Sequence, residues 1–394
     1  MRQLLAEALE PTVDIASLRQ RLGKHLTQRS FESDQLDAAY LAAASHFLGL
    51  SFKAPAPHQL PNGLPLEEWE GHLHGKQMPH LLHAIELGIL WALLGVVHKR
   101  DDYTIASLKV AHWFLNLLDN EASLMVGIWL PAVDFSKEKL GASLHLLFQI
   151  AGLISGDVRF ERASKAVPHE PEPFIQKIGA YLLPKIEKQT RFPLSLILEE
   201  MTVGAMSYHA RDWSGIFSLS GYHSGMGAIH RSDAKIVAIG PQRGPLDDLS
   251  TFGISRRPPF KEMGWEKSST GGLLQGCTQV DGLWVQMAVA IGPEEVHLGV
   301  RGEVKENTYM VFYVRGSTLL VDGIRSIKKG ELMHYRAPVS EIVIKGDKEK
   351  IRIQPFEPRM VEILPVCGGD SFFDSDFLIA FPWHQDHLQW KINF

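Results

Sequence analysis

The stretch Ser207-Tyr-His-Ala-Arg-Asp-Trp-Ser-Gly-Ile-Phe-Ser-Leu-Ser220 marks the point at which the character of the sequence changes. Before it, apolar residues recur at the three- and four-residue spacing of helices. After it, short β-branched and aromatic runs are separated by Gly, Asp, Asn and Pro. Strands joined by turns, with no helix between them, are typical of an antiparallel sandwich. We therefore predict a two-domain α+β protein, with an all-α domain over residues 1–212 and an antiparallel β-sandwich over residues 213–394.

The first half of the sequence consists of strongly apolar helical segments. Leu81–Val97 and Leu144–Ile154 are apolar over much of their circumference, and helices of this kind are buried between other helices. This pattern favours a helical array or an α/α toroid over one layer of helices on a sheet. Together with two helices before residue 30, we expect helices over residues 33–47, 80–98, 104–118, 137–153, 173–188 and 193–201.

Short segments of the second half have the composition of strands. We expect strands over residues 215–220, 235–239, 283–290, 309–314, 317–321, 341–344, 350–353, 359–365 and 376–380. The Pro-, Gly- and Arg-rich segment from Pro241 to Gly276 is predicted to be a long connection at the interface between the domains.

Composition and charge exclude several classes of protein. With 45% hydrophobic and 22% charged residues, the chain has the composition of a globular protein rather than a disordered or fibrous one. A formal net charge of −5 gives no overall field that attracts nucleic acid. Cys277 and Cys367 are too few for a disulfide framework, so we expect free thiols in a reducing compartment.

The sequence shows no clear targeting segment. Acidic residues interrupt the first ten positions, where a signal peptide needs an unbroken apolar run. Leu81–Val97 contains His83 and Glu86 and falls short of the roughly 20 residues that a membrane span requires. We expect a cytoplasmic protein with no membrane partner, although a protein exported without a cleaved signal would look the same.

Three clusters of polar residues are candidates for a functional site. The first precedes a long predicted helix and holds four histidines within twelve residues: His72, His74, His80 and His83. His72 and His74 could bind a metal together with a distant carboxylate, but no H-E-x-x-H or paired-cysteine pattern accompanies them. The alternatives are a substrate-facing loop and histidines that only satisfy hydrogen bonds.

The second cluster lies at the helix-to-strand transition and contains Tyr208, His209, Arg211 and Asp212. Such side chains are suited to proton transfer from a carbon acid. They are equally suited to a hydrogen-bond network that joins two domains. The sequence leaves both interpretations open.

The third cluster combines a glycine-rich segment, Gly221 to Asp233, with a stretch that reaches Asp247. Glycines let the backbone lie close to a ligand or to another segment. His230 with Asp233 and Asp247 could orient an imidazole, and His230 and Asp247 could hold a divalent metal. The alternative is a glycine-rich β-turn with solvated polar residues. Because no P-loop or dinucleotide fingerprint is present, we expect no required cofactor beyond this candidate metal.

The order of these elements resembles the heparinase II/III-like polysaccharide lyases, which join an α/α toroid to a β-sandwich. His74-Gly-Lys-Gln77 before a long helix is similar to the His-Gly loop of that family. Gly227-Ala-Ile-His-Arg-Ser-Asp233, then Lys235–Ile239, then Arg243-Gly-Pro-Leu-Asp247, is similar to its first sandwich strands. The similarity of architecture extends along most of the chain.

The resemblance implies a lyase that cleaves a uronic-acid-containing glycan by β-elimination. Tyr208 would remove the C5 proton or protonate the leaving oxygen, with His74 or His230 as its partner. Residues that would bind the substrate are His72, Gln77, Arg211, Arg231 and Arg243. The implied partner is an anionic polysaccharide or oligosaccharide, held by a basic rim on an otherwise acidic protein.

Departures from the family pattern keep two alternatives open. Leu73 occupies the position of the family's asparagine, and Ala228 that of a second histidine. The family's tyrosine is expected soon after the His-Gly loop, whereas Tyr208 comes much later. These departures favour a non-catalytic glycan-binding or scaffolding protein of the same fold. The other alternative, an α/α-toroid glycoside hydrolase, needs two carboxylates that face each other across a cleft.

Overall fold

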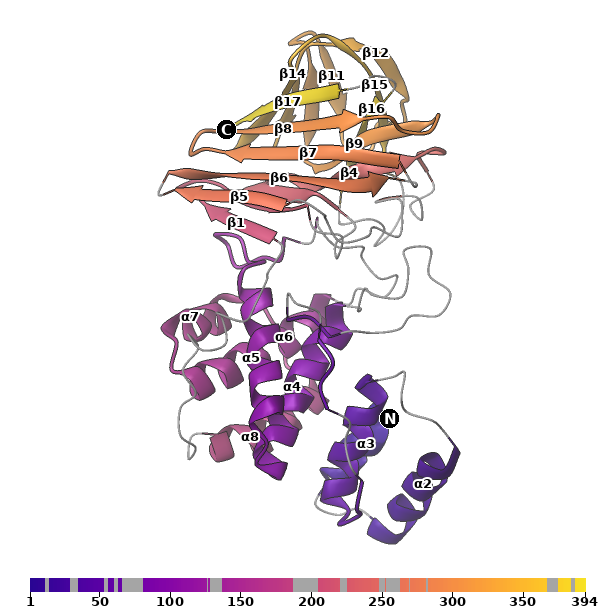
Figure 1. Cartoon of the computed structure of the whole chain (residues 1–394), viewed down its shortest axis with the longest axis vertical. Helices are drawn as coiled ribbons and strands as arrows, with labels where there is room; N and C mark the ends of the chain where they lie inside the picture. The colour runs from indigo at the N-terminus through magenta and orange to yellow at the C-terminus, as the bar shows by residue number, and fades with distance from the viewer. Residues whose placement is uncertain are drawn as a thin grey trace. The chain divides into compact units, whose positions relative to one another are not determined.

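The computed structural model describes residues 1–10, 14–28, 35–52, 56–59, 63–65, 81–125, 127, 137–186, 205–219, 225–247, 252, 263–268, 270–280, 283–366, 375–383 and 387–394. The chain divides into two compact units (Figure 1). Unit 1 comprises Met1–Glu70, Lys76–Leu115 and Asp134–Val203. Unit 2 comprises Gly71–Gly75, Asn116–Val133 and Gly204–Phe394.

Unit 1 is helical throughout its described elements. These are α1 (Arg2–Ala8), α2 (Ile15–Gln28), α3 (Gln35–Phe47), α4 (Leu81–His98), α5 (Asp101–Leu115), α6 (Lys137–Ser155), α7 (Val158–Ala166) and α8 (Pro173–Ile186). α4 contacts α3, α5, α6 and α8. Every residue of α4 from Ala84 through Gly95 is buried, as expected of a helix without a polar face.

By length and composition alone, α4 could cross a membrane. However, 72% of its apolar window is buried within the protein, which agrees with the predicted core helix. The helix also carries the buried carboxylate of Glu86, which accepts a hydrogen bond from the Arg2 guanidinium at 3.1 Å and another from the Tyr40 hydroxyl. Arg2 lies 3.2 Å from Glu172 as well. A buried charge is tolerated when it is paired, and this network ties α1, α3 and α4 together.

Unit 2 contains two antiparallel sheets. The eight-stranded sheet has the order β1 (Ala205–His209), β2 (Ser214–Ser218), β3 (Gly227–Arg231), β4 (Ala234–Arg243), β9 (Thr308–Arg315), β16 (Phe377–Pro382), β15 (Arg359–Pro365), β12 (Tyr335–Val339). The nine-stranded sheet has the order β11 (Arg325–Lys328), β10 (Thr318–Val321), β13 (Ile342–Lys345), β14 (Lys350–Pro355), β17 (His387–Asn393), β8 (Glu295–Gly302), β7 (Leu283–Ile291), β6 (Gly271–Val280), β5 (Met263–Ser268).

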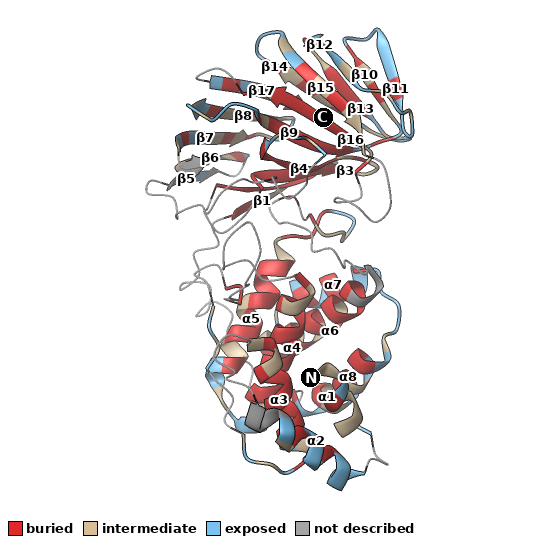
Figure 2. Ribbon diagram, turned by 90° about the vertical axis from the view of Figure 1, so that its right-hand side faces the viewer, coloured by how far each residue is buried: buried red, intermediate tan, exposed pale blue. Residues whose placement is uncertain are grey.

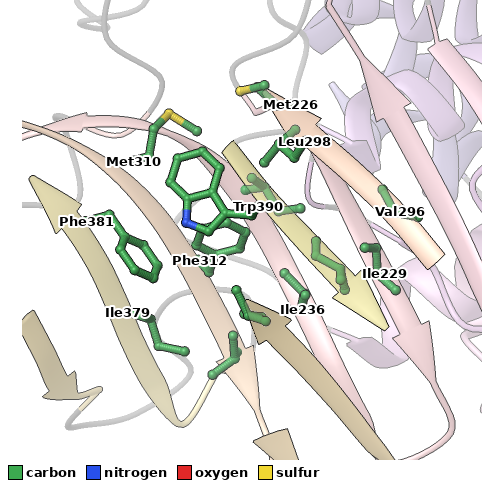
Figure 3. Packing of buried hydrophobic residues seen from close by; sticks show 14 of the residues in the cluster. Met226, Ile229, Ile236, Val296, Leu298, Met310, Phe312, Ile379, Phe381 and Trp390 are labelled. Atoms are coloured by element: carbon green, nitrogen blue, oxygen red, sulfur yellow. The ribbon is translucent and has the colours of Figure 1, made fainter. Parts of the chain in front are cut away.

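An apolar core joins the two sheets. Phe312, Phe381 and Trp390 meet edge to face within it, with ring centroids 5.5–5.9 Å apart (Figure 3). Alternate residues of strands such as β7, β8 and β9 enter this core, and buried residues accordingly run along the strands of both sheets (Figure 2). Because the side chains of a strand alternate between faces, the intervening residues lie on the outer faces of the sandwich.

The predicted fold class is confirmed, since helices fill the described N-terminal part and antiparallel sheets the C-terminal part. The predicted boundary after residue 212 differs from the structure in two ways. Ala205–His209 already forms strand β1, paired with β2. In addition, Asn116–Val133 belongs to unit 2, although it lies between helices in the sequence.

Several elements were not expected from the sequence. Strands β5 and β6 occupy part of the segment from Pro241 to Gly276 that was predicted to be a connection. Their glycines give little strand propensity, and pairing of β6 with β7 along its whole length supplies the stability instead. α7 was missed because it is short, at nine residues, and buries only Phe160, Ala163 and Ser164. The predicted helix over residues 193–201 lies outside the described residues, as does Cys367, while Cys277 is a free thiol.

His112 makes the stability of unit 1 dependent on pH. Burial, reinforced by the positive charge of Arg159, lowers the pKa of His112 from 6.5 to about 4. A histidine with a lowered pKa stabilises the folded state fully above pH 6.5, and this contribution is lost as the pH falls from 6.5 towards 4. We expect the unfolding free energy of the wild type to fall by about 2 kcal/mol more between pH 7 and pH 5 than that of His112→Gln.

Urea unfolding followed by circular dichroism at the two pH values measures this difference. The control is His58→Gln, because His58 is exposed and its substitution leaves the buried imidazole in place. Equal pH dependence of the wild type and His112→Gln would contradict the assignment.

Candidate functional site

A row of polar side chains crosses the first four strands of the eight-stranded sheet. In the strand register, His209 lies opposite Ser214, and Ser214 lies opposite His230. His230 in turn lies opposite Lys235. Residues directly opposite one another project from the same face of a sheet. Since Ile229 and Ile236, their neighbours in the chain, enter the core between the sheets, the polar row lies on the outer face.

A tight turn in the segment Asn116–Met125 covers this row. The Met125 amide donates to the Leu117 carbonyl at 2.7 Å, and the Asp119 amide donates to the Ser123 carbonyl at 2.9 Å. One oxygen of the Asp119 carboxylate, Oδ1, accepts the amides of Glu121 and Ser123 at 2.9 and 2.8 Å. Backbone bonds thus hold the Asp119 side chain in a fixed position within the turn.

The backbone that follows the turn approaches β3 and β4 very closely. A Cβ atom on Gly127 would lie 2.4 Å from the carbonyl oxygen of Val237 and 2.5 Å from that of Gly227. Such distances exclude any side chain at residue 127, so glycine is required there. The close approach shows that this segment packs against the sheet as part of unit 2.

The second oxygen of Asp119, Oδ2, reaches into the polar row. It lies 2.7 Å from Nδ1 of His230 and 3.7 Å from Nζ of Lys235. Asp119 and His230 are only 8% and 6% exposed. A carboxylate buried to this extent is stable when it is paired and hydrogen-bonded, and here two backbone amides, an imidazole and an ammonium group surround it.

The environment decides the protonation states of this pair. Burial opposes ionisation of Asp119, but the hydrogen bond from His230, the Ser123 amide and the charge of Lys235 together lower the pKa of Asp119. Burial lowers the pKa of His230, against the opposing hydrogen bond to Asp119. At neutral pH, Asp119 is therefore ionised and His230 neutral. In the tautomer that donates from Nδ1 to Asp119, Nε2 of His230 carries a lone pair.

The same turn is anchored a second time, at Ser214. The Asn120 amide donates to Oγ of Ser214 at 3.0 Å, and the Asn120 side chain donates to the Ala210 carbonyl at 3.0 Å. Nδ1 of His209 lies 3.2 Å from the same Ser214 hydroxyl. The polar row and the turn therefore form one continuous hydrogen-bonded cluster.

Tyr208, predicted to act with His230, does not join this cluster. It lies one residue from His209, so it projects from the opposite face of β1 and packs against the inter-sheet core. Its ring lies 5.2 Å from that of Trp213, and its hydroxyl donates to the Thr270 carbonyl at 3.3 Å. The prediction that Tyr208 and His230 act together in one site is therefore wrong, because strand alternation places them on opposite faces of the sheet.

Arg231 and Asp233, beside His230 in the sequence, connect the two sheets of the sandwich. The Arg231 guanidinium lies 2.7 Å from Asp212 and 3.2 Å from Glu349, and donates to the Lys350 carbonyl at 2.9 Å. The Asp233 carboxylate accepts the amides of residues 347–349 at 2.6–3.2 Å. The charge of Arg231 is thus already matched by carboxylates, which argues against its predicted role in substrate binding.

The structure also separates His230 from Asp247, which were predicted to bind a metal together. His230 is opposite Lys235 near one end of β4, whereas Asp247 follows Arg243 at the other end. The eight residue steps from Lys235 to Arg243 span about 26 Å along a strand. Among the described residues, no group of three or more His, Cys, Asp or Glu side chains is placed to hold a metal ion.

The remaining predicted residues fall into two sets. Arg211, Arg243 and Asp247 are exposed, Arg211 between β1 and β2 and the other two at the far end of β4. His72, His74 and Gln77 lie outside the described residues. Sequence reasoning missed Asp119, because its turn lies 111 positions before His230 and only the fold brings the two together.

Comparison with known proteins supports the fold. No protein-family model and no curated protein matches the sequence. Among solved structures, a Paenibacillus xanthan lyase matches with a TM-score of 0.50 and 10% identity over 91% of this chain and 42% of that one. The Streptomyces coelicolor A3 chondroitin AC lyase in complex with chondroitin sulphate matches with a TM-score of 0.50 and 10% identity, over 96% of this chain and 63% of that one.

At this identity the comparison shows a shared fold. The chain has a polysaccharide-lyase-like fold, and it spans less than two thirds of the length of each of these two enzymes. The coarser part of the resemblance predicted from the sequence is therefore confirmed. The solved structures that carry it are xanthan and chondroitin AC lyases rather than heparinase II/III-like enzymes.

Removal of the Asp119 carboxylate should destabilise unit 2. In Asp119→Ala, the buried His230 and the half-buried Lys235 lose their shared partner, which costs about 3 kcal/mol when one side of such a pair is removed. Urea unfolding measures the loss. Glu121→Ala is the matched control, since it removes an exposed carboxylate from the same turn and should change the unfolding free energy by less than about 0.5 kcal/mol. Equal midpoints for the two variants would show that the pair contributes no net stability.

Proposed function

We propose that this protein acts on an acidic polysaccharide and cleaves a uronic-acid linkage by β-elimination. The observation that carries the proposal is the ionised Asp119 that orients a neutral His230 beside Lys235. The lyase-like fold supports it, because two enzymes with this fold, by name a xanthan lyase and a chondroitin AC lyase, act on polysaccharides.

The chemistry follows from the protonation states. In β-elimination, a base removes the proton on C5 of the uronic acid, the C4–O bond breaks, and a C4=C5 double bond forms. Nε2 of His230 is the base, and Asp119 stabilises the imidazolium that results. The ammonium group of Lys235 favours the negative charge that develops on the substrate carboxylate. The imidazolium then returns the proton to the departing oxygen, so that no other acid is required.

A non-catalytic glycan-binding protein of the same fold is the second candidate. The low exposure of His230, 6%, and the position of Tyr208 on the opposite face favour it. In that case, the Asp119–His230 pair serves only to hold the turn against the sheet. Kinship with the heparinase II/III-like enzymes, an acidic glycan as the partner, the lack of a required cofactor and a cytoplasmic location all stay predictions.

The substitution His230→Gln separates the two candidates. It keeps a polar side chain of similar size but removes the base, so turnover should fall by about 10²–10⁴-fold. The assay follows the unsaturated product in the near ultraviolet, with chondroitin sulphate and xanthan as substrates. His334→Gln, an exposed histidine on the described surface of unit 2, should leave turnover unchanged.

Two results would count against the lyase. Undiminished turnover in folded His230→Gln would exclude His230 as the base. A wild-type protein that binds these polymers without releasing unsaturated product would establish the binding protein instead. Circular dichroism of each variant shows whether the sandwich remains folded.

A further inference from the structure

The nine-stranded sheet has a groove on its outer face, away from the Asp119–His230 pair. Strands β5, β6, β7, β8 and β17 line a hollow of about 800 Å³. The floor of the hollow is formed by small residues, among them Gly264, Ala288 and Gly299. Because the two sheets share one core, this groove and the polar row of the eight-stranded sheet lie on opposite faces of the sandwich.

The strand register arranges the lining side chains in two parallel rows. Gln275, Ala288, Gly299 and Gln389 are successive partners across four strands. Two residues along, Gln286, Arg301 and His387 form the next row. The first row extends about 14 Å across the sheet, with about 7 Å between the rows. The groove therefore has room for a short run of sugar rings laid across the strands.

The side chains of the groove are available to a ligand. Gln275, Gln286, Arg301 and Gln389 are all exposed. Lys391, further along β17, is paired with Glu295 at 2.5 Å. In contrast, no carboxylate among the described residues is paired with Arg301. A planar guanidinium of this kind binds carboxylate and sulphate groups through two parallel hydrogen bonds.

An aromatic residue lies on the same face just beyond the second row, next to the residues that line the hollow. Trp284 lies on β7, two residues before Gln286, and therefore projects from the same outer face. It is 42% exposed, which is unusual for so large an apolar side chain. An exposed indole offers a flat apolar surface with a polar edge. The apolar face of a sugar ring is a suitable partner for that surface.

We propose that this groove is a second glycan-binding site, which binds an acidic oligosaccharide with its sugar rings laid flat against the sheet. The glutamine amides donate to and accept from sugar hydroxyls, which are themselves donors and acceptors. Arg301, with His387 beside it, binds a carboxylate or sulphate substituent, and Trp284 stacks on a ring. The combination of amides, one cation and one flat aromatic group fits an acidic sugar chain better than an apolar ligand. The site does not depend on catalysis at His230.

Affinity electrophoresis of the full-length protein tests the site. Native gels contain chondroitin sulphate or xanthan as the probe, and retardation gives a dissociation constant. We expect Arg301→Ala to weaken binding by about tenfold or more, as the loss of a charge-assisted contact does. Trp284→Ala should weaken it by about tenfold as well, because the flat surface that stacks on a ring is lost. Trp284→Phe keeps a flat ring and should stay within a few-fold of the wild type. Both positions are at the surface, so the variants should fold.

The controls distinguish a sugar site from general attraction of polyanions. Arg336→Ala removes an exposed arginine from β12 of the other sheet and should leave retardation unchanged. Polyglutamate, a polymer with carboxylates but no sugar, should not retard the protein. His230→Gln should bind the polysaccharide through this groove as the wild type does, whether or not the protein is a lyase.

Three outcomes would overturn the site. They are equal weakening by Arg301→Ala and Arg336→Ala, equal retardation by polyglutamate, and a wild-type protein that neither polysaccharide retards. Loss of product in His230→Gln with binding retained supports both proposals. If the wild type binds the polysaccharide but releases no product, the result supports the groove and not the lyase.

Discussion

The mutual burial of the two sheets is the constraint on which unit 2 depends. Phe312, Phe381 and Trp390 pack in the space between them, and strands such as β7, β8 and β9 direct alternate residues into this layer. The intervening side chains of these strands then project from the outer face of one sheet or the other. Shifting a strand by one residue would bury its polar set, which is why the register is so strongly specified. The polar row on one face and the groove on the other are both consequences of this packing layer.

The fold class could be predicted because it rests on periodicity. α4 is apolar on all sides and is buried, and strands such as β9 and β14 were identified from their composition alone. β5 and β6 could not be found in this way, since their glycines have low strand propensity and only pairing with β7 makes them strands. The predicted boundary of the sandwich differs from the structure for a similar reason. Nothing local in residues 116–125 indicates that they pack with strands rather than with the helices on either side.

The candidate site shows the same division between local and distant information. His230 was identified from its glycine-rich surroundings, and the structure does place it among polar groups. Its partner was assigned wrongly, because Asp233 and Asp247 are near in sequence while Asp119 is near in space. Asp233 instead holds the turn at residues 347–349. Tyr208 was excluded by a simple geometric rule, since a residue adjacent to an outward-facing one must face inward. Correct assignment therefore required the register, which the sequence does not contain.

The Asp119 turn gives the sandwich an unusual dependence on the rest of the chain. Contact between Asp119 and His230 closes a loop of 111 residues, most of which belong to unit 1. Closure of a loop of this length costs about 4 kcal/mol in chain entropy, and such non-local contacts form late and slow the folding of a domain. A fragment that began at Gly204 would contain all the strands described here, β1 to β17, but would leave His230 and Lys235 without their carboxylate. The sandwich is consequently not a self-contained module that could be transferred to another protein by joining its strands alone, because one of its essential pieces is encoded within the helical half.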